Sequence, residues 1–117
     1  MMKEIVIPIL NYDYKVYLII GSDKECINYV NKYLKTRYTT EDTTNNRGMT
    51  FYKAGFHPVI WLRKGIDDPY NTVTHEAVHA INYIWEYIRE DSKEEVYAHS
   101  VASIVKAYEL KTKKSKL

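Results

Sequence analysis

Residues 74–80 read Thr-His-Glu-Ala-Val-His-Ala and contain the pattern H-E-x-x-H, with His75 and His79 one helical turn apart. On an α-helix, residues four positions apart lie on the same face, so both imidazoles can bind one metal ion. Glu76 follows the first histidine and lies within reach of a water molecule at that ion. The pattern therefore predicts a metal site with a carboxylate base, provided that this stretch is helical.

The surrounding sequence predicts such a helix over residues 69–89. Asp68 and Pro69 are residue types favoured at the N-cap and at the first helical position. Apolar residues then recur at intervals of three and four, which is typical of an amphipathic helix. These apolar positions are Val73, Ala77, Ala80, Ile81, Ile84 and Ile88. The metal pattern thus lies in the middle of the predicted helix.

Upstream of this helix, the sequence predicts two pairs of strands separated by another helix. β-Branched and apolar runs indicate strands over residues 4–9, 14–20, 49–53 and 58–63. The first pair is expected to form a hairpin that turns at residues 11–13. Ser22 and Glu25 match a capping box, which predicts a helix from residue 22 to about residue 38. The polar residues 39–48 are expected to form a surface loop.

A last helix is predicted after the interruption at residues 90–93, where either Asp91 or Ser92 can act as N-cap. Its apolar positions are Val96, Ala98, Val101, Ile104, Val105 and Tyr108. The short interruption predicts that the two final helices pack antiparallel. The element order β-β-α-β-β-α-α indicates an α+β fold, with helices packed on one face of a small antiparallel or mixed sheet.

The composition fits one soluble globular domain of 117 residues, of which 45% are hydrophobic and 27% are charged. We assign residues 1–110 to this domain and residues 111–117 to a basic C-terminal tail. No apolar run is long enough to span a membrane, and the N-terminal segment lacks a small-residue cleavage site. The single cysteine, Cys26, suits a reducing compartment. We therefore expect a cytoplasmic protein without a signal peptide or a membrane partner.

A third metal ligand must come from outside the H-E-x-x-H turn. Residues 82–85 read Asn-Tyr-Ile-Trp, and no histidine follows at the short metzincin spacing. The last predicted helix instead opens with Glu94 and Glu95, which lie about 100° apart around the helix, so only one of them can face the metal. We favour Glu95, because it shares a helix face with Ala98 and His99. Glu94 is then expected to be a solvated carboxylate in the first turn.

The H-E-x-x-H pattern followed by Glu95-Val96-Tyr97-Ala98 resembles the gluzincin pattern of zinc metallopeptidases, in which a later E-x-x-A-D supplies a ligand. The chain looks most like small gluzincin-like peptidases of bacteriophages and mobile elements, where the later motif is often E-E-x-x-A-Y. The resemblance covers about residues 56–105. It implies a minimal zincin architecture, with an active-site helix and a C-terminal glutamate helix. It also implies one Zn²⁺ per chain, held by His75, His79 and Glu95, in a bacterial or phage-infected cell.

His99 departs from the longer family pattern, which commonly has an aspartate there that orients a zinc-bound histidine. His99 lies one helical turn after Glu95, so several roles are open. It can orient a ligand through a hydrogen bond, or act as an acid or oxyanion donor. As a fourth ligand it would close the coordination sphere and make the metal structural. It can also be a surface or core histidine outside the site. His57 is expected to be a turn residue.

These features together predict hydrolysis of peptide bonds, with Glu76 as the general base that takes a proton from water and passes it to the leaving amine. In the enzymes that the chain resembles, the substrate lies extended beside an edge strand. Pro58 favours an edge position for the strand that it begins. The residues expected to bind a peptide by β-augmentation are Val59, Ile60, Trp61 and Leu62.

Two other functions remain open. The first is a catalytically silent metal-binding module for interaction or regulation, because the chain has no recognisable second subdomain to form a deep cleft. The intact Glu76 favours the enzyme, since metal binding alone does not require it. The second is nucleic-acid binding by the C-terminal lysines. A net charge of only +2 and the preference for lysine at helix C-termini argue against it. We therefore expect a peptide or protein substrate, and the oligomeric state stays open.

Overall fold

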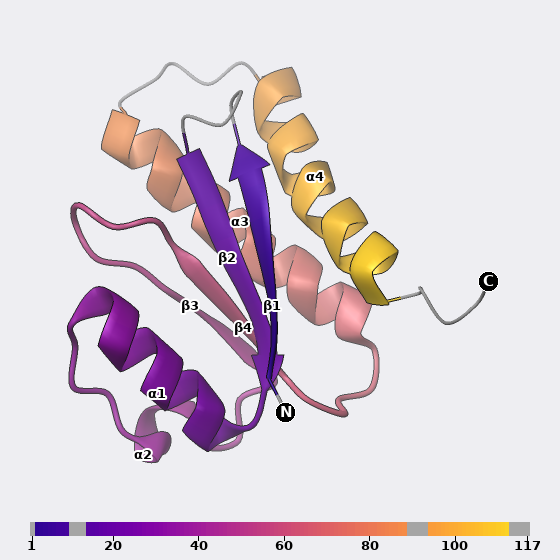
Figure 1. Ribbon diagram of the computed structural model, residues 1–117. Coiled ribbons are helices and arrows are strands. Elements are labelled where there is room, and N and C mark those ends of the chain that lie inside the picture. The colour runs from indigo at the N-terminus through magenta and orange to yellow at the C-terminus, as the bar shows by residue number, and fades with distance from the viewer. Residues whose placement is uncertain (1, 10–13, 89–93, 113–117) are drawn as a thin grey trace.

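A computed structural model describes residues 2–9, 14–88 and 94–112, with side chains for all of these except residues 87–88 and 94–96. The elements are β1 (Lys3–Ile9), β2 (Tyr14–Gly21), α1 (Asp23–Leu34), α2 (Thr40–Thr43), β3 (Gly48–Phe51), β4 (Val59–Arg63), α3 (Pro69–Ile88) and α4 (Glu94–Thr112) (Figure 1). They confirm the predicted α+β class. The expected turn at residues 11–13, the candidate caps Asp91 and Ser92, and the tail residues 113–117 lie outside the described residues.

The four strands form one mixed sheet in the order β1-β2-β4-β3. β1 and β2 form the predicted antiparallel pair, with Lys3 opposite Ile20 and Ile9 opposite Tyr14. β3 pairs antiparallel with β4, whereas β2 and β4 run parallel to each other. β1 and β3 are therefore the edge strands of the sheet.

β4 lies inside the sheet, so the edge position predicted for its residues is wrong. These residues, each at most 1% exposed, are Val59, Ile60, Trp61 and Leu62. Pro58 does not mark an edge, because it precedes β4 and its carbonyl accepts a hydrogen bond from the Tyr17 N–H at 3.1 Å. The missing N–H of the proline therefore costs the sheet no hydrogen bond.

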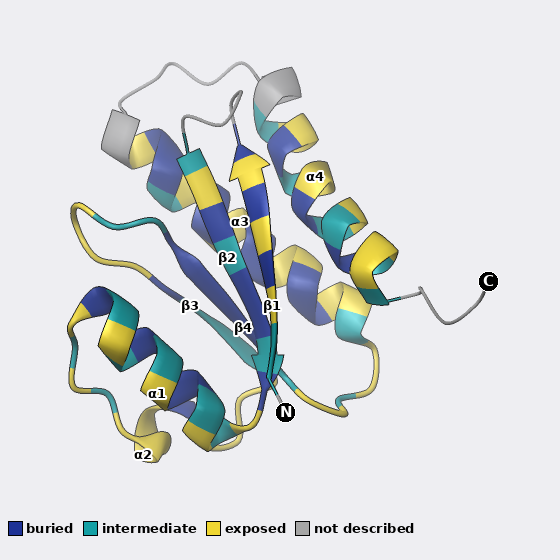
Figure 2. Cartoon of the chain, in the orientation of Figure 1, coloured by how far each residue is buried: buried dark blue, intermediate teal, exposed yellow. Residues whose placement is uncertain are grey.

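Helices cover both faces of the sheet, and the expectation that they pack on one face is wrong. α3 and α4 pack over the face to which Ile60 and Leu62 point, whereas α1 packs over Val59 and Trp61 on the other face. Figure 2 shows buried positions recurring along both α1 and α3. Because successive strand residues point to opposite faces, the uninterrupted apolar run of β4 was the sequence signal for a strand covered on both sides.

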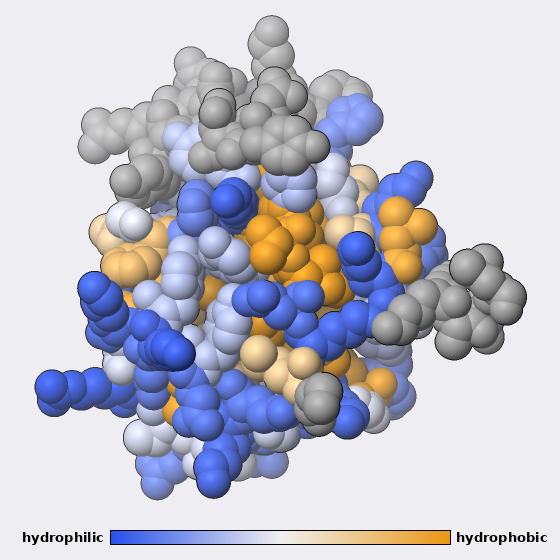
Figure 3. Space-filling view, in the orientation of Figure 1, coloured by the Kyte–Doolittle hydropathy of each residue, from blue (hydrophilic) through white to orange (hydrophobic). Residues whose placement is uncertain are grey.

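β1 stays partly uncovered, because α1 packs against β2 and β4. Figure 3 shows a hydrophilic surface over α1 and α2, and hydrophobic atoms that reach the surface beside β1. Val6 of β1 is accordingly 47% exposed. Among the described residues, no helix is long and apolar enough to cross a membrane.

α1 begins as predicted and ends earlier than predicted. The Ser22 hydroxyl accepts the Glu25 N–H at 3.2 Å, and the Glu25 carboxylate accepts the Ser22 N–H at 2.9 Å, so the predicted capping box is confirmed. Lys35 has a left-handed conformation with a φ of 58°, which ends the helix at Leu34. Within residues 39–48, expected to be a loop throughout, α2 forms one short helical turn.

α3 and α4 form the predicted antiparallel pair. Near the segment that connects them, the rings of Trp85 and Tyr97 lie 5.9 Å apart between centroids. At the opposite end of the pair, the rings of Tyr70 and Tyr108 lie 5.4 Å apart. The beginning of α4 therefore lies beside the C-terminal half of α3.

An ion pair ties α1 to β4. The Arg63 guanidinium donates to both carboxylate oxygens of Asp23, and the Thr43 hydroxyl donates to the same carboxylate at 2.5 Å. The hydrogen bond from Arg63, followed by that from Thr43, holds the pKa of Asp23 below its ordinary value of 3.8. The charged form of Asp23 is therefore favoured in the folded protein.

We expect Asp23→Asn to lower the free energy of unfolding by about 1 kcal/mol at neutral pH. Because the pKa of Asp23 is lower in the folded than in the unfolded state, this contribution is present above pH 3.8 and is lost as the pH falls through the folded pKa. Urea unfolding of both proteins across this range should show the difference disappearing in strong acid. Asp67→Asn is the control, since its pair with Arg47 is exposed. A difference that persists in strong acid would contradict this account.

Candidate metal centre

His75 and His79 lie side by side on the exposed face of α3. Their Nε2 atoms are 3.2 Å apart, and their ring centroids are 4.8 Å apart. Two nitrogen atoms that bind one zinc ion, each at about 2.0–2.1 Å, lie about this far apart. The two imidazoles therefore fit one zinc ion at their present spacing.

The apolar stripe of α3 sets the direction of these side chains. Its sheet-facing residues Val73, Ala77 and Ala80 are fully buried, and this fixes the rotation of the helix about its axis. The two histidines occupy exposed positions between them. The same stripe that predicted the helix from sequence thus turns the imidazoles of His75 and His79 toward solvent.

Glu76 lies beside the edge strand β3 and is only 7% exposed. The Thr50 hydroxyl of β3 donates to its Oε1 atom at 2.8 Å and also lies 3.0 Å from the Glu76 carbonyl oxygen. This contact holds the carboxylate between the helix and the strand. Thr50 was not identified from the sequence, because a single threonine in a short strand carries no recognisable pattern.

A cleft of about 330 Å³ joins His75 and Glu76 to the segment that enters β3. Its wall on that side is formed by residues 45–48, and its other wall is the first two turns of α3. The lining residues are Asn45, Asn46, Arg47, Gly48, Asn71, Thr72, His75 and Glu76. One candidate ligand, His75, and the candidate base therefore line the same cleft.

The choice between Glu94 and Glu95 stays a prediction, because their side chains lie outside the described residues. The first described side chain of α4, Tyr97, donates its hydroxyl to Asn82 Oδ1 at 2.8 Å and lies 3.3 Å from the Val78 carbonyl oxygen. The start of α4 is therefore anchored beside the residue that precedes His79. Among the described side chains, no three metal-ligating groups gather at one point.

His99 is exposed on α4, and its carbonyl accepts a hydrogen bond from Ser103 Oγ at 2.9 Å. The described hydrogen bonds and ring contacts do not join its imidazole to His75 or His79. Each role considered for His99 therefore stays a prediction.

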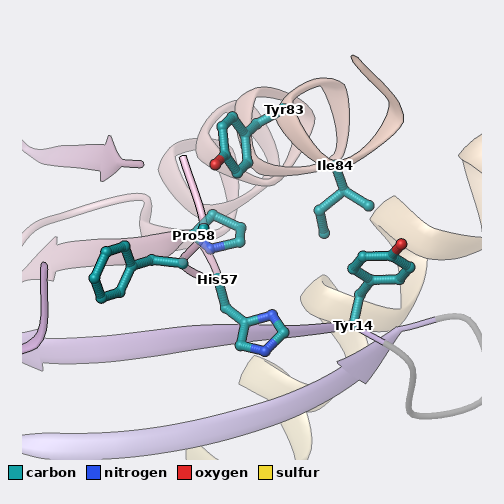
Figure 4. A pocket seen from close by; sticks show the side chains of 7 residues that line it. Tyr14, His57, Pro58, Tyr83 and Ile84 are labelled. Atoms are coloured by element: carbon teal, nitrogen blue, oxygen red, sulfur yellow. The ribbon is translucent and has the colours of Figure 1, made fainter. Parts of the chain in front are cut away.

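A second cavity, of about 180 Å³, lies near the C-terminal end of α3 (Figure 4). Tyr83, one helical turn after His79, lines it together with Phe56 and His57. The His57 Nδ1 atom accepts the Lys15 N–H at 3.3 Å, and burial, followed by the charge of Lys15, lowers the pKa of His57. His57 is thus a hydrogen-bonded residue after the turn, and it lines this aromatic cavity.

Comparison of the chain with protein-family models gives no match, and neither a curated protein nor a solved structure matches it.

Proposed function

We propose that this protein is a zinc-dependent peptidase of gluzincin-like architecture. One observation carries the proposal: the Nε2 atoms of His75 and His79 lie 3.2 Å apart, and His75 lines the same cleft as the buried Glu76. A pair of histidines alone does not distinguish a catalytic metal site from a structural one. The neighbouring Glu76 adds a group that metal binding does not require and that proton transfer does.

In this proposal, His75, His79 and Glu95 hold one Zn²⁺ per chain, which leaves one position of a tetrahedral ion open. Zinc held there would act as a Lewis acid, which would lower the pKa of a bound water molecule and polarise a peptide carbonyl. The choice of all three ligands follows from the sequence pattern, and the spacing of the two Nε2 atoms supports the part of it that concerns His75 and His79.

Glu76 is the general base in this proposal. Its carboxylate takes a proton from the attacking water and then passes it to the nitrogen of the leaving amine. The Thr50 hydroxyl orients the carboxylate by donating to Oε1, which leaves Oε2 for the proton transfer. Thr50 therefore acts as a positioning residue through Glu76.

The substrate strand in this proposal lies beside β3 (Gly48–Phe51), in place of the interior strand β4. β3 pairs only with β4 among the described strands, so its other side has backbone groups available to an extended peptide. The Thr50 side chain contacts Glu76, so β3 lies close to the candidate base.

The second candidate is a catalytically silent metal-binding module on the same scaffold. The observation that favours it is the restraint on Glu76, which is 7% exposed and already hydrogen-bonded to Thr50. A base that cannot reach its water molecule leaves a metal site without catalysis. Both candidate functions therefore include a bound zinc ion, and they differ in whether the protein hydrolyses peptides.

Metal analysis and a turnover assay on the purified protein separate these candidates. We expect one zinc per chain, cleavage of a mixed peptide library detected by mass spectrometry, and loss of that cleavage with a zinc chelator. Zinc added back should restore it. Bound zinc without any cleavage would support the silent module, and a folded protein without zinc affinity would exclude both.

A further inference from the structure

Arg47 lies in the same cleft as His75 and Glu76, and it is the only lysine or arginine among the described residues of its lining. Beside Arg47, the lining carries the side-chain amides of Asn45 and Asn71, and its one carboxylate, that of Glu76, is buried and hydrogen-bonded to Thr50. A guanidinium among amides is a favourable environment for a carboxylate. This part of the cleft therefore differs in chemistry from the aromatic cavity near Tyr83.

The backbone at Arg47 is fixed in place against the sheet. Its carbonyl accepts the Arg63 N–H at 2.9 Å, which ties it to β4. At the next residue, a Cβ atom added to Gly48 would lie 2.7 Å from the Trp61 carbonyl oxygen and 2.9 Å from Thr72 Cγ2. The chain thus packs closely against β4 and α3 here, so Arg47 projects from a rigid base beside the candidate site.

The present partner of the guanidinium is replaceable. Arg47 Nη1 lies 2.9 Å from Asp67 Oδ1, Nη2 donates to the Asp67 carbonyl oxygen, and Nε lies 3.5 Å from Thr72 Oγ1. The side chains of Arg47 and Asp67 are 48% and 92% exposed, respectively. Exposed ion pairs of this kind contribute little net free energy, so another carboxylate can take the place of Asp67.

We propose that Arg47 and the neighbouring amides form a subsite for a carboxylate of the peptide substrate, close to the bond on which Glu76 acts. The carboxylate belongs either to the C-terminus of the peptide or to an aspartate or glutamate side chain. This inference rests on the proposed peptidase function and narrows its substrate class to peptides with an acidic group next to the cleaved bond.

Binding of short peptide probes to the zinc-loaded protein tests the subsite independently of turnover. The probes are acetyl-Ala-Glu-amide against acetyl-Ala-Gln-amide, and acetyl-Ala-Ala with a free C-terminus against its amide. Calorimetry should show about tenfold tighter binding of the acidic member of at least one pair. The pair that shows this preference identifies the source of the carboxylate.

Three variants test whether the tighter binding of acidic probes depends on Arg47. Arg47→Gln should abolish it without releasing zinc, which separates the subsite from direct binding of a carboxylate to the metal. Arg37→Gln removes the same charge at another exposed position and should leave the preference unchanged. Asp67→Asn removes the competing carboxylate and should strengthen binding of the preferred acidic probe.

The outcomes distinguish the subsite from the proposed function. If peptides are cleaved but acidic and amide probes bind equally, or the preference survives in Arg47→Gln, the subsite proposal is wrong and the peptidase stands. If the preference depends on Arg47 but no peptide is cleaved, the subsite stands and the peptidase proposal is wrong.

Discussion

Glu76→Gln is expected to abolish peptide hydrolysis while one zinc ion stays bound to each chain. The substitution removes the carboxylate that takes the proton and keeps the shape of the side chain. The Thr50 hydroxyl, now 2.8 Å from Oε1, can still donate to the amide oxygen, so the buried side chain keeps its partner. General bases contribute about 10²–10⁴ in rate, and we therefore expect a loss of about a thousandfold.

The matched control is Glu86→Gln, which changes an exposed glutamate on the same helix and should leave the rate unchanged. Initial rates on the peptide that the unaltered protein cleaves fastest, zinc content and urea unfolding should be measured on all three proteins. Hydrolysis that survives in Glu76→Gln would show that the mechanism is wrong, although the metal site would stand. Loss of zinc in Glu76→Gln would instead assign this residue to the metal.

The helices were predictable because their signals are local. The capping box of Ser22 and Glu25, and the apolar stripe of α3, depend on residues within one or two turns. Pro69 starts α3 as predicted, although Asp68 before it has a left-handed φ of 50° in place of the extended conformation usual for an N-cap. The exact local geometry depends on the packing of neighbouring elements, which no local pattern contains.

The position of β4 in the sheet was not predictable from its own sequence. Pro58 is compatible with an edge strand and equally with the position just before an interior strand, where no N–H is needed. The uninterrupted apolar run that includes Ile60 and Trp61 indicates cover on both faces, but an edge strand can be covered on both faces too. Cover on both faces also requires α1 and α3 to lie on opposite faces, which is a property of the whole chain.

The candidate site, like the fold, was predictable from the sequence only in part. The spacing of His75, Glu76 and His79 on one helix was readable from sequence, and the structure brings the two imidazoles together. Thr50 and Arg47 contribute from a segment about 25 residues earlier, and their contacts depend on the antiparallel pairing of β3 with β4. A sequence pattern identifies candidate ligands that lie on one helix. The groups proposed to orient the base or to bind the substrate lie on other segments, which only the fold brings close.

His75→Ala and His79→Ala are each expected to lower zinc affinity by at least about a hundredfold. Each variant removes one of the two Nε2 atoms that lie 3.2 Å apart, and the remaining imidazole alone does not define a site. In the proposed site, zinc would stabilise the folded state by about 2.7 kcal/mol at a hundredfold excess over Kd, and we expect each variant to lose this stabilisation. Competition with a zinc-binding dye and thermal unfolding with and without zinc measure both effects.

The same two measurements on α4 variants decide the rest of the coordination sphere. Glu95→Gln should reduce zinc affinity as strongly as the histidine variants do, and Glu94→Gln should leave it unchanged. The reverse result would assign the ligand to Glu94. For His99→Ala, a hundredfold loss means a fourth ligand, a smaller loss of about tenfold means an orienting hydrogen bond, and no loss places His99 outside the site. A fourth ligand would close the tetrahedral sphere and favour the silent module, because no position would then be left for water or substrate.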